Sequence, residues 1–331
     1  MSVAVVIPFF QRKPGLLRRA VSSIGEQVGV PPVRVVVVDD ASPIDAKDEL
    51  AELPTFATPL EIEIVRQPNG GPAKARNRGL DALAADVDRV AFLDSDDVWR
   101  PHHLAQALSA LDADHDVYFC DFHQPGQTVG AFGRAGRLDP SRHPAFPGRP
   151  SLHTYQGDMF DQVMFGNVIG TSTIVYAFDR FATQRFDEAY FSAGEDYLMW
   201  IEFARRGARF AFSSDIGVDY GYGVNIYAGS GWGTDGFLDR VHNEMRYRKR
   251  LLAFPLSAAQ RTLVDAKIRA LRREFAMGVM FNVFRRRPLD VALLRAQWRL
   301  DPLSLVTIPT EAGTMAAERI RGRVAARKKG S

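Results

Sequence analysis

The chain has 331 residues, of which 46% are hydrophobic and 24% are charged, and it contains one cysteine, Cys120. This composition excludes a disordered chain, a fibrous repeat and a scaffold held by disulfides. The net charge of +3 is unevenly distributed, because residues 269–331 hold 14 Lys or Arg against 5 Asp or Glu, a balance of +9, which leaves −6 on the rest. A basic C-terminal part favours an anionic partner, such as a membrane surface or a nucleic acid.

The first 122 residues alternate short apolar runs with segments of helical periodicity. The apolar runs predict strands over residues 3–9, 33–38, 60–65, 89–93 and 117–122. Between them we predict a helix that begins near Pro14, and helices over residues 44–53, from the turn at 68–72 to about Ala84, and over 101–111. This order predicts an α/β fold with a parallel sheet, right-handed crossovers and helices on both faces.

The second half is less regular. Residues 124–150 are predicted to form a long loop, followed by a strand at 173–178, a helix at about 195–206 and a strand at 209–212. Six glycines within residues 221–236 predict a mobile loop. Beyond it, apolar residues with helical spacing predict helices: Val264, Ile268, Leu271, Phe275 and Val279.

No segment is predicted to cross a membrane. The longest uncharged stretch, residues 162–178, is too short and too polar to span a bilayer. The N-terminus runs directly into a predicted strand without a basic leader, so we expect no signal peptide. Peripheral association with a membrane stays open.

Three of the predicted strands are followed by polar clusters, which are residues 8–12, 39–42 and 94–97. Because the carboxyl ends of parallel strands meet at one edge, we expect these clusters to lie together. Asp39 and Asp40 could cap the following helix, or accept hydrogen bonds from a uracil or a ribose. Asp94-Ser95-Asp96 could equally be a turn, but its carboxylates also suit Mg²⁺ or Mn²⁺.

Two further segments have both a structural and a functional interpretation. The turn that begins at Asn69 opens a helix carrying Lys74 and Arg76, and a glycine-rich turn at a helix N-terminus favours an anion. Glu195 and Asp196 begin another predicted helix, either as capping acids or as a general base. The neighbours His102 and His103 point in different directions on a helix and receive no role.

Five motifs together resemble the inverting family 2 glycosyltransferases with the GT-A fold, a Rossmann-like, mostly parallel twisted sheet flanked by helices. They occur in the family's order across about residues 3–215, and are Val5-Val6-Ile7-Pro8-Phe9-Phe10, Val37-Val38-Asp39-Asp40-Ala41-Ser42, Asn69-Gly70-Gly71-Pro72 with Ala75-Arg76-Asn77, Phe92-Leu93-Asp94-Ser95-Asp96-Asp97, and Gly194-Glu195-Asp196. A closer similarity is to bacterial exopolysaccharide glucosyltransferases of the succinoglycan type. It is carried by the long loop, the basic tail and the sequence Gly223-Val224-Asn225-Ile226-Tyr227. The Gln-x-x-Arg-Trp motif of processive synthases is absent from the sequence, so we do not expect a polymerase.

The resemblance implies a UDP-sugar donor and a role for each matching residue. The donor would be bound by Pro8, Phe10, Asp39, Asp40, Asn69, Lys74, Arg76, Asp94 and Ser95. A Mn²⁺ or Mg²⁺ ion would be bound by Asp94 and Asp96, and Asp196 would be the general base. Trp99, Glu195 and Tyr197 are candidates for the acceptor site, whereas Trp200 is expected in the core.

The expected enzyme is an inverting, metal-dependent hexosyltransferase. It would move a hexose, expected to be glucose, to a saccharide or lipid-linked saccharide acceptor in exopolysaccharide biosynthesis. Residues 1–235 would form the nucleotide-sugar-binding catalytic domain, and residues 236–331 a basic helical extension that binds an anionic membrane or forms a homodimer. We expect a cytoplasmic location, either free or peripheral at the inner face of the cytoplasmic membrane.

Two alternatives fit less well. A nucleotidyltransferase would carry a glycine- and arginine-rich loop after the first strand, which residues 10–15 do not provide. A nucleic-acid-binding module would leave the acidic clusters unexplained, since carboxylates repel phosphates. We therefore expect no nucleic-acid partner.

Overall fold

The computed structural model describes residues 2–190, 194–222 and 230–309. Contacts divide the chain into a larger unit that extends to residue 225 and a smaller unit that follows it. Most of the glycine-rich segment, the motif around Gly223 and the basic residues 310–331 lie outside the described residues.

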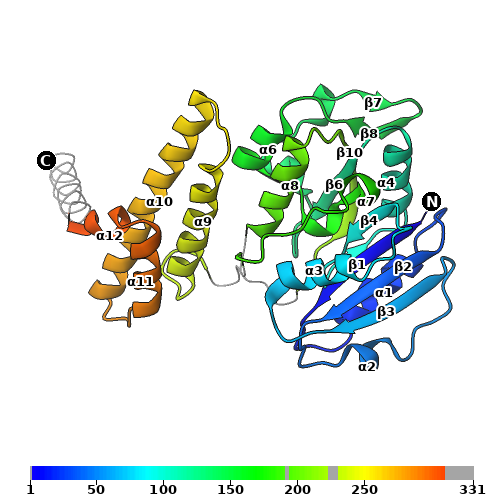
Figure 1. Ribbon diagram of the computed structural model, residues 1–331, viewed down its shortest axis with the longest axis horizontal. Coiled ribbons are helices and arrows are strands. Elements are labelled where there is room, and N and C mark those ends of the chain that lie inside the picture. The colour runs from blue at the N-terminus through cyan, green and yellow to red at the C-terminus, as the bar shows by residue number, and fades with distance from the viewer. Residues whose placement is uncertain (1, 191–193, 223–229, 310–331) are drawn as a thin grey trace, which may run out of the picture. The chain divides into compact units, whose positions relative to one another are not determined.

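The larger unit is built on a mixed sheet (Figure 1). In spatial order, its described strands are β3 (Leu60–Arg66), β2 (Val33–Asp39), β1 (Val3–Phe9), β4 (Arg89–Phe92), β9 (Val175–Ala177), β6 (Val117–His123), β10 (Phe210–Asp219), β8 (Arg149–Thr154) and β7 (Ala145–Phe146). The short strand β5 (Val98–Trp99) pairs with the end of β10. The first four strands of this order are mutually parallel, as expected.

The second half of the sheet is mixed rather than parallel. Strand β9 lies between β4 and β6 and is antiparallel to both, and β8 is antiparallel to β10. The segment expected to be a long loop contains a helix, a 3-10 turn and strand β7, and leads into β8. Strand β10 runs seven residues beyond the predicted end at Phe212, to Asp219, through two irregularities in its pairing with β6.

Helices cover both faces of the sheet (Figure 1). Those of the larger unit are α1 (Leu16–Gly25), α2 (Ala46–Leu50), α3 (Gly71–Asp81), α4 (His103–Asp112), α5 (Ala131–Ala135), α6 (Met159–Gly166), α7 (Phe178–Phe181) and α8 (Glu195–Arg205), with 3-10 turns η1 (Pro140–Arg142) and η2 (Thr171–Thr173). Helices α1 and α4 share one core with the side chains of Val5 and Ile7. Helix α3 packs on the opposite face, where Gly79 approaches Val6 and Val38 so closely that a Cβ would lie 2.3 Å from a Val6 methyl group.

The smaller unit is helical, as expected. It contains α9 (Phe237–Leu251), α10 (Ala258–Phe284), α11 (Val291–Leu300) and α12 (Leu303–Val306). The predicted apolar face of α10 is buried from Val264 to Val279. Asp301 is buried and forms ion pairs with Lys249 and Arg272, which ties the end of α11 to α9 and α10. None of the helices described is long and apolar enough to cross a membrane.

Candidate active site

The three polar clusters meet at the carboxyl edge of the parallel strands. Gln11, after β1, joins them by two hydrogen bonds that it donates: its backbone N–H donates to Ser42 Oγ at 3.0 Å, and its side-chain amide donates to Ser95 Oγ at 3.0 Å. Segments that follow β1, β2 and β4 are thereby joined directly. Pro8 and Phe10 are half-buried beside this junction, while Ser95 is buried within it.

The Asp40 carboxylate organises the turn before α3. It accepts hydrogen bonds at 2.8 Å from the backbone N–H groups of Gly70 and Gly71 and from the side chain of Gln67. The Asn69 side chain donates to the Asp40 carbonyl at 3.0 Å. These bonds show that Asp40 holds the turn, and the contact with a nucleotide that was expected of Asp40 stays a prediction.

Asp39 is placed differently. Its Oδ1 accepts a hydrogen bond from the Ser42 N–H at 2.8 Å, whereas its Oδ2 lies 3.9 Å from Arg66 Nε. Asp39 therefore keeps an oxygen with only a weak contact, as a group that binds a nucleotide base requires.

Arg76 is a buried bridge rather than an open anion site. Its guanidinium lies 2.7 Å from Asp94 Oδ1 and 3.1 Å from Glu195 Oε1, and it stacks over Phe186. Burial alone would lower the pKa of Arg76, but the charges of Asp94 and Glu195 raise it above the usual value. Arg76 thus joins the end of β4 to the start of α8, which is at odds with an expected direct contact to the donor.

Lys74 is the cation that remains exposed at the same turn. Its aliphatic chain covers Gly70, where a Cβ would lie 2.5 Å from Lys74 Cδ. Its ammonium forms no hydrogen bond or ion pair with any residue that the structure describes. An exposed ammonium at the first turn of a helix is suited to bind an anion.

The acidic loop after β4 is held by its last residue. The Asp97 carboxyl accepts hydrogen bonds from Ser172 Oγ at 2.5 Å and from the Gly221 N–H at 2.9 Å. Burial, and then the charges of Asp94 and Asp96, raise the pKa of Asp97 well above its usual range. Asp97 belongs to the predicted motif but received no role from the sequence, because its partners come from distant parts of the chain.

The donor chemistry of Asp94 and Asp96 fits a divalent cation. The Asp94 side chain is 32% exposed and Asp96 is half-buried, so both are accessible. After burial, the charges of these two carboxylates raise the pKa of Asp97, which shows that negative charge gathers in this loop. Within the described part of the chain, no group of three or more His, Cys, Asp or Glu could hold a metal ion by itself. A cation here would need further ligands from a substrate or water, as Mg²⁺ sites commonly do.

Asp196 lies in the first turn of α8. Its Oδ1 accepts a hydrogen bond from the Tyr197 N–H at 2.8 Å, and its Oδ2 lies 3.5 Å from Thr171 Oγ1. Burial, followed by the charge of Glu195, raises the pKa of Asp196 to about 7. A carboxylate with a pKa near neutrality is suited to exchange protons at physiological pH.

The aromatic side chains near the site differ in how far they are buried. Trp99 is 2% exposed, and its indole N–H donates to the Ser172 carbonyl at 2.7 Å. This burial corrects the expectation that Trp99 stacks on an acceptor sugar. Trp200 is fully buried, as expected for a core residue, and Tyr197 is half-buried next to Asp196. Tyr220, which the sequence did not single out, stacks on Phe122 beside the acidic loop.

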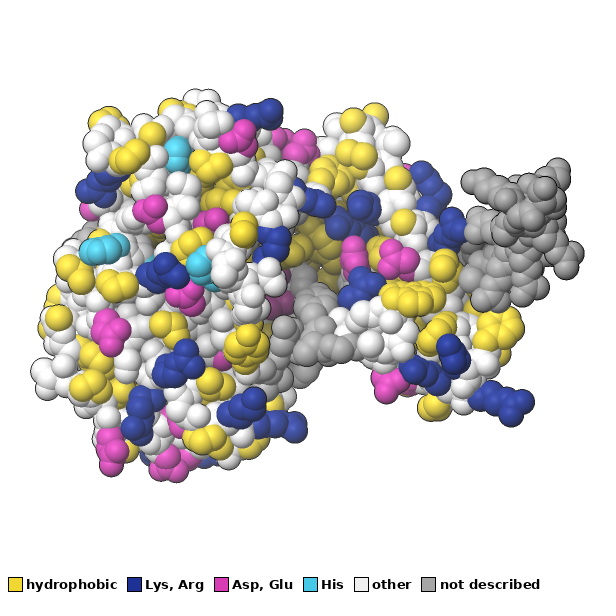
Figure 2. Space-filling view, turned by 180° about the vertical axis from the view of Figure 1, so that it is seen from behind, with side chains coloured by type: hydrophobic (Ala, Val, Ile, Leu, Met, Phe, Trp, Pro, Cys, Tyr) yellow, Lys and Arg dark blue, Asp and Glu magenta, His cyan; other side chains and the backbone are white. Residues whose placement is uncertain are grey.

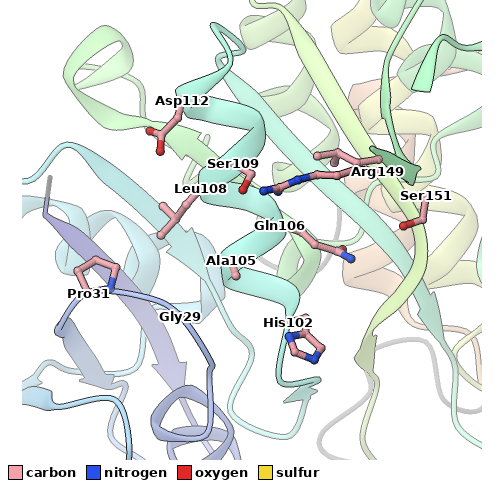
Figure 3. A pocket seen from close by; sticks show the side chains of 11 residues that line it. Gly29, Pro31, His102, Ala105, Gln106, Leu108, Ser109, Asp112, Arg149 and Ser151 are labelled. Carbon is pink, nitrogen blue, oxygen red and sulfur yellow. The ribbon is translucent and has the colours of Figure 1, made fainter. Parts of the chain in front are cut away.

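A separate groove lies along α4 (Figure 3). It has a volume of about 510 Å³ and lies between α4, the segment before β2 and strand β8. It is lined by Gly29, Pro31, His102, Ala105, Gln106, Leu108, Ser109, Asp112, Arg149, Ser151 and Leu152. None of the site residues predicted from the sequence lines this groove, so it is distinct from the acidic edge. His103 and Cys120, which the sequence left without a catalytic role, are both buried.

Comparisons with known proteins agree with this geometry. Residues 4–169 match the family model Glycosyl transferase family 2. The succinoglycan biosynthesis protein ExoW of Rhizobium meliloti (strain 1021) is 35% identical over 259 residues, which cover 75% of this chain and 80% of that protein.

Two solved structures show the same fold at low sequence identity. S. aureus TarS 1-349 in complex with UDP-GlcNAc has a TM-score of 0.54 at 17% identity, covering 94% of this chain and 84% of that one. The mannosyltransferase PcManGT from Pyrobaculum calidifontis, in complex with GDP-Man and Mn²⁺, has a TM-score of 0.54 at 16% identity, covering 96% and 85%. The family resemblance and the GT-A fold expected from the sequence are confirmed. The chain belongs to family 2 of the glycosyltransferases and is a glycosyltransferase.

Proposed function

We propose that this glycosyltransferase moves a hexose, glucose in the first instance, from a UDP-sugar to a saccharide or lipid-linked saccharide acceptor in exopolysaccharide assembly. The name of the relative from Rhizobium meliloti, a succinoglycan biosynthesis protein, supports the pathway class. The domain assignment, with residues 1–235 catalytic and 236–331 an extension, stays a prediction. The cytoplasmic location, either free or at the inner face of a membrane, also stays a prediction. The alternative of a homodimer through the C-terminal helices stays a prediction as well.

The proposal rests mainly on one observation. A carboxyl group suited to act as a general base lies close to the acidic residues at the carboxyl edge of the parallel strands, where the nucleotide would bind. Asp196 has a pKa of about 7, and Arg76 links the first turn of its helix to Asp94. Asp196 would take the proton from the acceptor hydroxyl as that oxygen attacks the anomeric carbon. Direct displacement with a single base and no carboxylate nucleophile inverts the configuration, which gives a β-linkage from a UDP-α-sugar.

The donor would be bound along the same edge. Asp39, through its weakly engaged Oδ2, would accept a hydrogen bond from the uracil N3–H, with Pro8 and Phe10 beside the base. Ser95 would support this part of the edge through its bond with Gln11. Lys74 would neutralise part of the charge on the diphosphate, since its ammonium is exposed at the turn.

Asp94 and Asp96 would hold a Mn²⁺ or Mg²⁺ ion. Such an ion, when bound, neutralises charge on the departing diphosphate. Arg76 would keep Asp94 in place, because its guanidinium contacts Asp94 from the buried side. Asp97 would fix the loop through Ser172 and Gly221.

A donor panel tests this proposal. UDP release would be measured with several UDP-hexoses and, as a comparison, GDP-mannose, with and without Mn²⁺. We expect release with one UDP-hexose in Mn²⁺, little without metal, and loss of calorimetric UDP–Mn²⁺ binding in Asp96→Ala. Glu202→Gln, a change of an acid further along α8, is the matched control and should leave both quantities unchanged. Release with GDP-mannose alone, or undiminished UDP–Mn²⁺ affinity in Asp96→Ala, would contradict the proposal.

A further inference from the structure

We propose that helices α11 and α12 form a surface that docks on an anionic lipid bilayer. The surface, called here the α11–α12 surface, consists of Val291, Leu294, Arg295, Trp298, Arg299 and Leu305, which line one shallow hollow. This proposal rests on the proposed function in one respect, because a lipid-linked acceptor is found at a membrane. It adds which part of the chain contacts that membrane.

Helix α11 leaves large apolar side chains exposed while it buries a polar one. Its one buried residue is polar: Gln297 lies 2.6 Å from His242 Nδ1 and donates to Ser304 Oγ at 2.8 Å. In contrast, Val291 is 56% exposed and Trp298 is 51% exposed. Residues 291, 294 and 298 share one face by helical spacing, and because Leu294 is half-buried while Val291 and Trp298 are exposed, much of this apolar face is accessible to solvent.

The neighbouring helix ends enlarge the apolar area. Leu303 and Val306 of α12 are 49% and 57% exposed, and Phe284 at the end of α10 is 81% exposed. The hollow itself has a volume of about 290 Å³. Several large apolar side chains exposed within two short helices are more than the scattered exposure usual for a soluble surface.

The charge around this area is positive. Arg295 and Arg299 belong to the surface itself, and three further arginines, residues 285–287, lie four to six residues before α11, although Arg287 forms an ion pair with Asp235. The nearby acid Asp290 uses its carboxylate to cap α11, accepting from the N–H groups of Ala292 and Leu293. Figure 2 shows basic, acidic and hydrophobic side chains interspersed over the C-terminal helices. In the sequence, residues 310–331 add six Lys or Arg against two Glu.

This combination matches a bilayer better than a second copy of the chain. In a two-fold symmetric contact the surface would face itself, and because its lining includes Arg295 and Arg299 but no acid, the contact would bring like charges together. Anionic headgroups instead attract the arginines while the aliphatic and indole side chains enter the interface, where tryptophan is favoured.

The first experiment is co-sedimentation of the full chain with vesicles. We expect binding to phosphatidylcholine vesicles that contain about 30% phosphatidylglycerol, weak binding to pure phosphatidylcholine, and release at high salt, because the attraction is largely electrostatic. Equal sedimentation with both kinds of vesicle at low salt would overturn the proposal.

Variants locate the contact. We expect Val291→Ser with Trp298→Ser, and separately Arg295→Gln with Arg299→Gln, to lower partitioning by about tenfold or more. Leu263→Ser is the matched control, because Leu263 is 50% exposed on α10, away from this surface, and the change should leave binding intact. Loss of binding only on removal of residues 310–331, with the four surface changes silent, would overturn the assignment. So would a dimer that dissociates in Val291→Ser while vesicle binding is absent.

Fluorescence gives a readout at one side chain. Trp298 is one of four tryptophans, so brominated lipids should quench part of the emission in the wild type. We expect Trp298→Phe to keep binding but lose that quenching; retained quenching would overturn the proposal. UDP release measured on the same preparations separates the two proposals, because the surface changes should not affect hydrolysis of a soluble donor.

Discussion

Two neighbouring carboxyl groups at the start of α8 lie in different surroundings. Glu195 forms an ion pair with Arg76, which counteracts the rise in its pKa that burial causes. Asp196 forms no ion pair within the described residues, and its pKa rises to about 7. Neighbouring acids with different environments are typical of sites where one holds charge and the other exchanges a proton.

The pH dependence of transfer follows from Asp196. A general base must be deprotonated to accept the hydroxyl proton, and a pKa of about 7 means that the base is progressively protonated as the pH falls below that value. We expect kcat/KM to fall toward about tenfold per pH unit on the acidic side and to level off above about pH 8. A profile that stays flat from about pH 8 to pH 5 would exclude a base with this pKa.

Arg76 should act on both stability and donor binding. In Arg76→Lys the positive charge stays, but a single ammonium cannot reproduce the planar guanidinium that contacts Asp94 and Glu195 together. We expect a loss of roughly 1–3 kcal/mol in the free energy of unfolding, with weaker UDP–Mn²⁺ binding. Thermal unfolding and calorimetry measure the two effects. Arg78→Lys, at an exposed position of the same helix, should change neither, and equal behaviour of the two variants would contradict the bridging role.

At the scale of elements, the candidate site residues lie at the ends of strands and not in their middles. The carboxylate of Asp97 joins the loop after β4 to η2 and to the end of β10. Gly221, at that end, lies so close to the acidic loop that a Cβ would be 1.8 Å from the Asp96 carbonyl oxygen. The position of Asp96 therefore depends on the last strand of the sheet.

Gly221→Ala tests this dependence. The added methyl group would force backbone to move, which typically costs about 1–3 kcal/mol, and the displaced atom belongs to Asp96. We expect a lower melting temperature and at least about tenfold weaker UDP–Mn²⁺ binding. Gly231→Ala is the control, since a Cβ there meets nothing within 4 Å. If Gly231→Ala were as damaging as Gly221→Ala, the close contact would not be the cause.

The parallel strands could be predicted because each is a continuous apolar run, as a strand covered on both faces requires. The β7–β8 hairpin could not, because Pro147, Gly148 and Pro150 interrupt residues 145–154, which contain no continuous apolar run, and their pairing depends on the distant strand β10. The motifs placed the acidic clusters at one edge, which the bonds of Gln11 confirm. They did not reveal that Asp40 and Arg76 bind other parts of the chain, because such partners depend on tertiary packing.

On the scale of the whole molecule, charge is distributed unevenly along the chain. Residues 1–268 carry a net charge of −6 and include the acidic edge, whereas residues 269–331 carry +9 and include the α11–α12 surface. An acidic edge that requires counter-charge and a basic surface that attracts anions are complementary to different ligands. We therefore assign donor binding to the edge of the sheet and, as proposed above, membrane contact to the C-terminal helices.

The most direct test compares binding with turnover in Asp196→Asn. The change keeps the side-chain volume and removes the proton acceptor, and loss of a general base typically costs about 10²–10⁴ in rate. We expect UDP–Mn²⁺ affinity close to that of the wild type by calorimetry, and transfer to an acceptor at least about a hundredfold slower. Glu195→Gln should be slowed less if Glu195 only positions the helix. Transfer by Asp196→Asn at the wild-type rate, or an inactive Glu195→Gln beside an active Asp196→Asn, would contradict the assignment of Asp196 as the base.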